Sequence, residues 1–261
     1  VRTTMINLPA DVTVTGTPGG QRPLLTGSVA SDPLVVSFSG GLTLRHLHIR
    51  NTAPDGQAAS LGNGLGEQLV LEATGAAGTG VFVGGLLRDS IVRVNGPSAV
   101  AVRAGGSVAD PGRLRNVTAI ADGGGTGVRV AGFLGGATGY FDEHADIRNS
   151  IVRGAPALLA KAAGPDASGA GTIALARSDV PVSGRTTAGG AFARITDLGG
   201  NLDGSALLAD IAAGDLRQLA GSPTIDAGAT DAFTGAKDVD GAARVTGAAI
   251  DIGAHEHVPA P

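Results

Sequence analysis

Short apolar stretches with alternating side chains recur along the chain, and Gly-rich turns separate them. In most of them an aliphatic residue is followed by a charged residue, a small polar residue and an aliphatic or β-branched pair. Alternation with period two is typical of strands that bury one face. The recurring stretches are LRHLHIRN (44–51), GEQLVLEA (66–73), LRDSIVRV (87–94), LRNVTAIA (114–121) and IRNSIVRG (147–154).

The stretches align on a charged position, occupied by Arg45, Glu67, Arg88, Arg115 and Arg148, with steps of 22, 21, 27 and 33 residues. A second short strand follows most Gly-rich turns, as in VFVGG, AVAVRAGG and GVRVAGFLGG. Strand units of this length favour a coil in which each strand pairs with its equivalent one turn further. An α/β solenoid requires a helical stripe in every unit, and 206–221 is the one helical candidate.

We therefore predict an all-β fold, a right-handed parallel β-helix solenoid with about 20–30 residues per turn and a C-terminal cap. The predicted organisation is β-helix turns over 1–220, a capping segment of the same domain over 221–256 and the start of a linker at 257–261. The inward columns are expected to hold Leu44, Leu47, Ile49, Leu87, Ser90, Val92, Leu114, Val117, Ala119, Ile147, Ser150 and Val152.

The charged columns alternate in sign along the predicted coil. Equivalent residues stack about 4.8 Å apart, so Arg45, Glu67 and Arg88 form one ladder, and Arg50, Glu72 and Arg93 form a second. We interpret these arginines as architectural. The functional alternative is an anionic-ligand groove lined by His48, Arg50, Arg93 and Arg153, with an acidic polysaccharide as the natural ligand.

The position after the charged residue holds His46, Asp89, Asn116 and Asn149. Asn and Asp tolerate left-handed backbone conformations and bond to nearby backbone groups. We expect this column to form the bend between two strands of each turn.

Composition excludes several classes of function. With 19 basic and 23 acidic residues and no basic run, the chain lacks the positive stripe that nucleic acid requires. There is no cysteine, hence no disulfide or thiolate metal site, and no apolar run long enough to span a bilayer. The first residue is Val, so we expect the chain to be processed or to be a domain of a longer protein.

The stretch LRNVTAIADGGGTGVRV resembles the repeats of right-handed parallel β-helix proteins of the pectate-lyase-like superfold. The C-terminal third, with SPTIDAG, DVDGAAR and DIGAHE, resembles the ending of secreted bacterial β-helix proteins of the choice-of-anchor type. The resemblance covers nearly the whole chain. It implies an extracellular or cell-surface location, but that superfold hosts lyases, epimerases, hydrolases, adhesins and non-catalytic surface proteins, so it implies no single function.

The C-terminal motifs also have a physical interpretation. An open solenoid end exposes core and strand edges, and the interleaved acidic and aliphatic residues of 221–256 suit a cap cross-linked by Arg244. In the alternative interpretation, Asp238 and Asp240 with Gly241 begin a calcium loop, since alternating carboxylates and a turn glycine suit a hard cation. No cofactor is required.

Catalytic candidates are few. A β-elimination lyase of this superfold, as the resemblance implies, places calcium-binding acids and an Arg or Lys base on one strand face. The candidates are Arg93 and Arg153 of the outward arginine column and, outside it, Asp142, Glu143 and His144. The last three lie in an apparent insertion that we interpret first as an exposed acidic loop. His46 and His48, two residues apart on one strand and so expected on the same face, are a candidate metal pair that would need a third ligand from a neighbouring turn.

Three functions follow from these features. We rank first a non-catalytic extracellular β-helix that serves in adhesion, spacing or surface assembly, with polysaccharide contact and self-association as expected partner classes. The second is a polysaccharide lyase or related enzyme acting on acidic polysaccharide. The third is a non-catalytic glycan-binding module. With no Trp, one Tyr and six Phe, the chain supplies few aromatic platforms for sugars.

Overall fold

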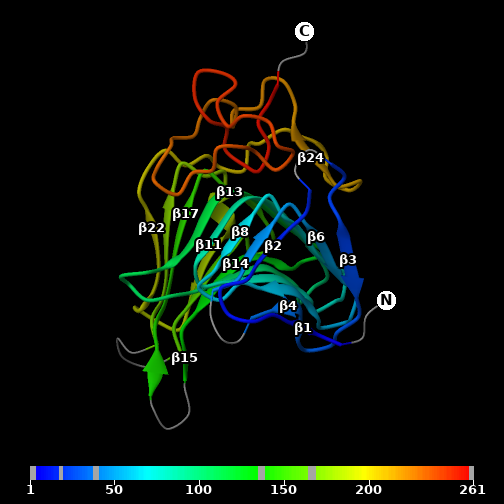
Figure 1. Cartoon of the computed structure of the whole chain (residues 1–261). Helices are drawn as coiled ribbons and strands as arrows, with labels where there is room; N and C mark the ends of the chain where they lie inside the picture. Colours follow the sequence, from blue (N-terminus) through cyan, green and yellow to red (C-terminus); the bar gives the residue numbers. More distant parts are fainter. Residues whose placement is uncertain (1–3, 18–19, 38–40, 135–138, 164–168, 259–261) are drawn as a thin grey trace.

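The chain coils into a parallel β-solenoid, as predicted (Figure 1). This computed structural model describes residues 4–17, 20–37, 41–134, 139–163 and 169–258. Within these ranges the elements are strands and a single 3-10 turn, Val182–Gly184, without an α-helix. The described residues include no helix with the length and apolar character needed to cross a bilayer.

Two long parallel sheets form along the coil. The eight-stranded sheet, called the first sheet below, takes one strand from each successive turn. Its strands, in spatial order, are β1 (Ile6–Asn7), β4 (Pro33–Val36), β7 (Gln57–Ser60), β10 (Thr79–Val83), β12 (Val100–Ala104), β14 (Thr126–Ala131), β19 (Leu158–Lys161) and β21 (Arg185–Ala188).

The twelve-stranded sheet, called the second sheet, is bent, so that each turn contributes up to two strands or one long one. Its main row is β2 (Thr13–Thr15), β5 (Thr43–Arg45), β8 (Leu65–Glu67), β11 (Leu86–Asn95), β13 (Gly112–Asp122), β17 (Glu143–Arg148), β20 (Gly171–Ala176) and β22 (Ala193–Asp197). Beyond the bend lie β3 (Leu24–Gly27), β6 (His48–Asn51), β9 (Val70–Ala73) and β18 (Ile151–Arg153).

The register confirms the predicted columns. Arg45 faces Glu67 and Glu67 faces Arg88 on neighbouring strands. The second ladder, from Arg50 through Glu72 to Arg93, is also in register. Each column is therefore a row of adjacent side chains along the solenoid.

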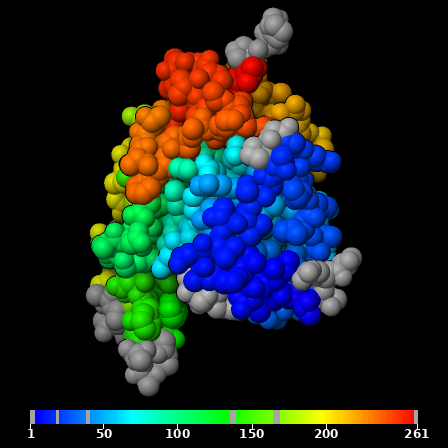
Figure 2. Space-filling model, viewed as in Figure 1, coloured from blue at the N-terminus to red at the C-terminus, as the bar shows by residue number. Residues whose placement is uncertain are grey.

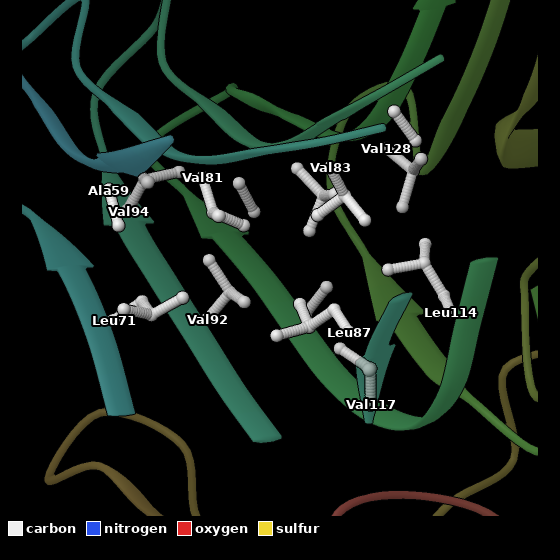
Figure 3. Close-up of a cluster of buried hydrophobic side chains, with 14 of the residues drawn as sticks. Ala59, Leu71, Val81, Val83, Leu87, Val92, Val94, Leu114, Val117 and Val128 are labelled. Carbon is white, nitrogen blue, oxygen red and sulfur yellow. The ribbon is translucent and has the colours of Figure 1, made fainter. Parts of the chain in front are cut away.

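The predicted inward columns form one continuous core between the two sheets (Figure 3). Leu44, Leu87 and Leu114 are fully buried at successive turns of one column. Gly66 interrupts this column, because a Cβ there would lie 2.8 Å from the Leu61 and Leu87 methyl carbons that already fill the space. GEQLVLEA therefore begins with Gly, where the other stretches begin with Leu or Ile, because packing leaves no room for a side chain there.

The bend of the second sheet is made by a column of left-handed residues. His46, Asp89, Asn116 and Asn149 have φ values of 51°, 51°, 53° and 49°, and Gln68 joins them at 54°. This confirms the predicted bend. The polar side chains do not serve their own turn, however, since Asn116, Asn149 and Asp89 bond to the C-terminal segment instead.

The C-terminal segment, residues 205–257, lies across the flank of the second sheet, on the side away from β1 and β4 (Figures 1 and 2). Gln68, Asn116 and Asn149, on three different turns, donate to its backbone carbonyls at 2.7, 2.9 and 2.8 Å. The segment that we expected to cap the solenoid thus contacts three parts of the coil along its flank. At the start of the predicted linker, the backbone amide of His257 donates to Asp251 Oδ2. Residues 259–261 of that linker fall outside the described residues.

Two further features of this segment differ from expectation. The helical candidate at 206–221 is an antiparallel hairpin of β23 (Leu208–Asp210) and β24 (Asp215–Gln218). The outward side chains Ile91 and Ile120 are buried, because Leu216, Val239 and Ala254 of the segment cover them. The segment thus gives the bent sheet a second apolar layer on its outer side.

A second hairpin leaves the coil between turns. It pairs β15 (Phe133–Leu134) with β16 (Tyr140–Phe141) and projects to one side of the solenoid (Figure 1). It lies within the insertion that lengthens the last repeat step.

Candidate functional site

The arginine groove predicted on the second sheet is closed by ion pairs. Glu72 Oε2 lies 2.7 Å from His48 Nε2 and 2.6 Å from Arg50 Nε. The hydrogen bond from His48, followed by that from Arg50, lowers the pKa of Glu72 to about 2. The side chains of His48 and Arg50 are therefore directed at a neighbouring strand rather than at a ligand.

The two arginines proposed for catalysis are engaged in the same way. Arg93 donates from Nη2 to the Ile211 carbonyl at 2.9 Å, so it fastens the C-terminal segment, and its carboxylate partner is Asp122 at 3.9 Å. Arg153 Nη2 lies 2.5 Å from Oδ2 of the buried Asp179. Both contacts support the architectural interpretation of this column.

The insertion candidates Asp142, Glu143 and His144 do not converge. Asp142 Oδ1 accepts a hydrogen bond from the Ala170 amide at 2.8 Å. His144 Nδ1 lies 2.6 Å from Thr172 Oγ1, and burial lowers the pKa of its imidazole. Glu143 and His144 line different grooves, so the three side chains do not form one catalytic cluster.

The metal candidates are separated by local backbone geometry. His46 is at the left-handed bend and its Nε2 lies 3.2 Å from the Gly20 carbonyl, while His48 pairs with Glu72. The expectation that the two imidazoles share a face is wrong, because the bend breaks the strand alternation. Among the described residues, no group of three or more His, Asp or Glu side chains is arranged to hold a metal ion.

The Asp238 and Asp240 pair belongs to a turn. Asp238 Oδ1 accepts from the amides of Asp240 and Ala242 at 3.0 and 2.7 Å, and its Oδ2 accepts from the Glu256 amide at 3.0 Å. Asp240 Oδ2 lies 3.4 Å from His255 Nε2. Backbone amides thus occupy the Asp238 oxygens that a calcium loop would direct at the cation.

The structure instead brings together basic residues on the outer face of the first sheet. A groove of about 870 Å³ follows this face. Its floor is one column of the register, with one residue from each successive strand: Ser60, Phe82, Arg103, Arg129 and Leu159. Lys161, Glu143 and Phe133 also line it, and we call it the basic groove.

The charge of this sheet differs from that of the whole chain. The chain carries a formal charge of −4, yet the eight strands of the first sheet contain four basic residues and no acidic one. Arg185 of β21 pairs with Asp197 at 2.9 Å. The remaining three, Arg103, Arg129 and Lys161, line the basic groove.

Arg103 and Arg129 face each other on adjacent strands with no carboxylate of the described residues within 4.0 Å of either guanidinium. Like charges in facing positions destabilise a sheet. Burial, and then the charge of Arg103, lowers the pKa of Arg129, although an arginine remains protonated at neutral pH. An anion bound between the two guanidiniums would relieve this repulsion.

Glu143 is the acidic member of the groove lining. Burial raises the pKa of its carboxyl, while the charge of Arg103 and the Gly106 amide oppose that shift. Among the described residues, no ion pair joins Glu143 to Arg103, so the guanidinium remains open to a carboxylate of a ligand.

Sequence reasoning found these strands but not their charge. AVAVRAGG and GVRVAGFLGG align Arg103 with Arg129, and the equivalent position of VFVGG is Phe82. The sequence does carry a signal for this site. The ladders on the second sheet alternate between Arg and Glu, whereas the column that contains Arg103 and Arg129 has no Glu or Asp.

Comparison with known proteins adds little to this description. The sequence matches no family model and no curated protein. Among solved structures, the chain is similar to that titled crystal structure of pectate lyase Pel9A, at 12% sequence identity with a TM-score of 0.29, over 98% of this chain and 87% of the other. The parallel β-helix fold is shown by the strand register itself, and the function is proposed below from the geometry of the site.

Proposed function

We propose that this protein binds an acidic polysaccharide in the basic groove without cleaving it, as an extracellular surface protein that serves in adhesion, spacing or surface assembly. The observation that carries the proposal is the facing pair Arg103 and Arg129 on a sheet whose strands contain no acidic residue. Arginine binds carboxylates through paired, charge-assisted hydrogen bonds.

The shape of the groove supports a polymer as the ligand. Its floor takes one side chain from each of five successive strands, at the interstrand spacing of about 4.8 Å. A chain of repeating units lying along the solenoid axis meets a repeating row of protein side chains. Two neighbouring acidic groups of the polymer then reach the adjacent Arg103 and Arg129.

The composition of the groove supports binding without cleavage. The lyase arrangement that the sequence resemblance implies needs several acids and a base on one strand face. Glu143 is the one acidic residue among the described groove-lining residues, and Asp142 and His144 do not line the basic groove. Arginines without an acidic cluster suit a binding role.

The test is isothermal titration calorimetry of the purified protein with polygalacturonate and with alginate, each at two salt concentrations. For Arg103→Gln/Arg129→Gln we expect affinity to fall by about tenfold or more, since a hydrogen bond to a charged group contributes about 1.5–3 kcal/mol. The matched control, Arg45→Gln/Arg217→Gln, removes two exposed arginines elsewhere and should bind like the original protein. Equal affinity of both double variants would refute the groove.

The same samples test the lyase alternative. β-Elimination leaves an unsaturated sugar that absorbs in the ultraviolet, so product formation is followed directly during the titration. Saturable binding without unsaturated product supports the proposal. Turnover that disappears in Glu143→Gln or in the arginine double variant would make the protein an enzyme.

A further inference from the structure

Aromatic residues are scarce in this chain but concentrated at one place. The sequence has six Phe, one Tyr and no Trp. Three of these seven, Phe133, Tyr140 and Phe141, lie on the β15–β16 hairpin. The main core, by contrast, is built from Leu, Val, Ile and Ala.

Two of the aromatic rings are stacked on each other. Phe133 and Phe141 are partners in the antiparallel register, and their ring centroids lie 5.2 Å apart at an interplanar angle of 16°. Nevertheless Phe133 is 48% exposed and Phe141 is 45% exposed. Contiguous exposed apolar surface of this kind is characteristic of a binding site.

The pair adjoins the basic groove. Phe133 lines the groove together with Arg129, which lies four residues earlier on the same extended stretch. Leu134 and Tyr140, the other facing pair of the hairpin, lie on its opposite face. The hairpin therefore presents its stacked rings next to the arginines, and different side chains on the other face.

We propose that Phe133 and Phe141 form a stacking platform for a sugar ring of an acidic oligosaccharide whose carboxylates occupy Arg103 and Arg129. This inference rests on the proposed function and specifies its ligand. The C–H face of a pyranose packs on an aromatic ring, while its carboxylate needs a cation, and both surfaces lie along one groove. A uronic acid chain has both features.

The spacing of the two contacts sets a minimum ligand length. Arg129 lies on β14 and Phe133 on β15, and the path from one to the other runs across the row of Arg103 and Arg129. Four residues of chain span up to roughly 13 Å, so we expect a ring on Phe133 and a carboxylate on Arg129 to belong to different sugar units. An oligosaccharide reaches both contacts and a single uronic acid does not. We therefore expect oligogalacturonate to bind at least about tenfold more tightly than galacturonate monomer.

The test uses the lack of tryptophan in the chain. In Phe133→Trp the indole is the sole tryptophan, and its emission should change saturably as oligogalacturonate is added, with an affinity close to that of the original protein. Phe133→Ala/Phe141→Ala should bind about threefold to tenfold more weakly. Leu134→Ala, on the same hairpin but the opposite face, is the matched control and should leave affinity unchanged.

The outcomes separate this inference from the proposed function. If the arginine double variant loses binding while the Phe double variant and Leu134→Ala do not, the platform is refuted and the basic groove stands. If the original protein binds no acidic polysaccharide, the proposed function itself fails. If the Phe double variant changes the oligomeric state in analytical ultracentrifugation and leaves affinity unchanged, the pair is a contact between copies, and the platform is refuted.

Discussion

Arg244 Nη2 lies 2.7 Å from Oδ1 of Asp89, a residue 155 positions earlier at the left-handed bend of β11. The same guanidinium donates from Nη1 to Glu256 Oε1 at 2.9 Å. Both carboxylates are fully buried. This ion triad joins the C-terminal segment to the middle of the solenoid: Arg244 pairs with one acidic residue of the terminal motif, Glu256, and its second carboxylate, Asp89, belongs to the coil.

Replacement of Arg244 should strongly destabilise the protein. In Arg244→Ala, two buried carboxylates lose their shared partner, and breaking a buried ion pair costs about 3–5 kcal/mol. Urea unfolding followed by circular dichroism measures the change. Arg217→Ala, at an exposed pair with Asp215, is the control and should shift stability by less than about 1 kcal/mol. A small effect in Arg244→Ala would mean that the segment is not held at this point.

The two carboxyls of this triad should contribute more to stability at mildly acidic pH than at pH 8. Burial raises the pKa of Asp89 to about 6 and that of Glu256 to about 7, despite the opposing charge of Arg244. Because these values lie above those of the unfolded chain, near 4, the folded protein binds the protons more tightly. The resulting contribution to stability is present at low pH and is lost as pH rises through about 6 to 7.

Thermal unfolding between pH 5.5 and pH 8 tests this pH dependence. The midpoint at pH 5.5 relative to that at pH 8 should be higher in the original protein than in Glu256→Gln, which is neutral at every pH. The imidazoles of His144 and His255, whose pKa values burial lowers, act in the opposite direction in both proteins, so the comparison isolates the carboxyl. The carboxyl of Glu72, whose pKa is about 2, stays ionised throughout this window and does not contribute to the change. The same midpoint difference in the two proteins would contradict the assignment.

Asn149 should contribute to the free energy of unfolding through both its side chain and its backbone. Its Nδ2 donates to the Ala229 carbonyl at 2.8 Å and its Oδ1 accepts from the Ala229 amide at 3.0 Å, while its own φ is 49°. Asn149→Ala loses both bonds and strains the left-handed backbone, so we expect a loss of about 2–4 kcal/mol.

Asn149→Gly separates these two effects, since glycine adopts positive φ without strain. It should be less destabilised than Asn149→Ala in the same urea titration. Equal stability of the two variants would show that the hydrogen bonds to Ala229 account for the whole effect.

Calcium should not stabilise the C-terminal segment. Both oxygens of Asp238 already accept backbone amides, and a cation at the turn would displace three hydrogen bonds. We expect the same unfolding midpoint in millimolar calcium as in chelator. A saturable rise with calcium that is absent in Asp240→Asn would restore the calcium loop.

The repeated alternation of the sequence sufficed for the coil and its register. Arg45, Glu67 and Arg88 are equivalent because the strand period of two and the unit length leave one alignment that keeps Leu44 and Leu87 inside. The left-handed bend was predicted from a column of Asn and Asp residues, because their backbone preferences are local. These features depend on residues close in sequence or one repeat apart.

The location of the C-terminal segment was decided by tertiary contacts alone. Ile91 and Ile120 point outward in the strand alternation, and the pattern does not specify what covers them. The 206–221 stretch has helical spacing, yet Gly214 at a φ of 84° and the pairing of Leu208 with Gln218 close it as a hairpin. Burial against a distant surface outweighs such weak local preference.

The same distinction separates the paired arginines from those of the candidate site. The sequence shows where each Arg is, but the residue that it pairs with lies on the strand of the next turn of the solenoid, about 4.8 Å away. Arg50 meets Glu72 there, whereas Arg103 meets Arg129. The sequence by itself determined the fold and the stacking, and the tertiary structure decided which cations are neutralised and which line a groove, because electrostatic pairing depends on distance in space.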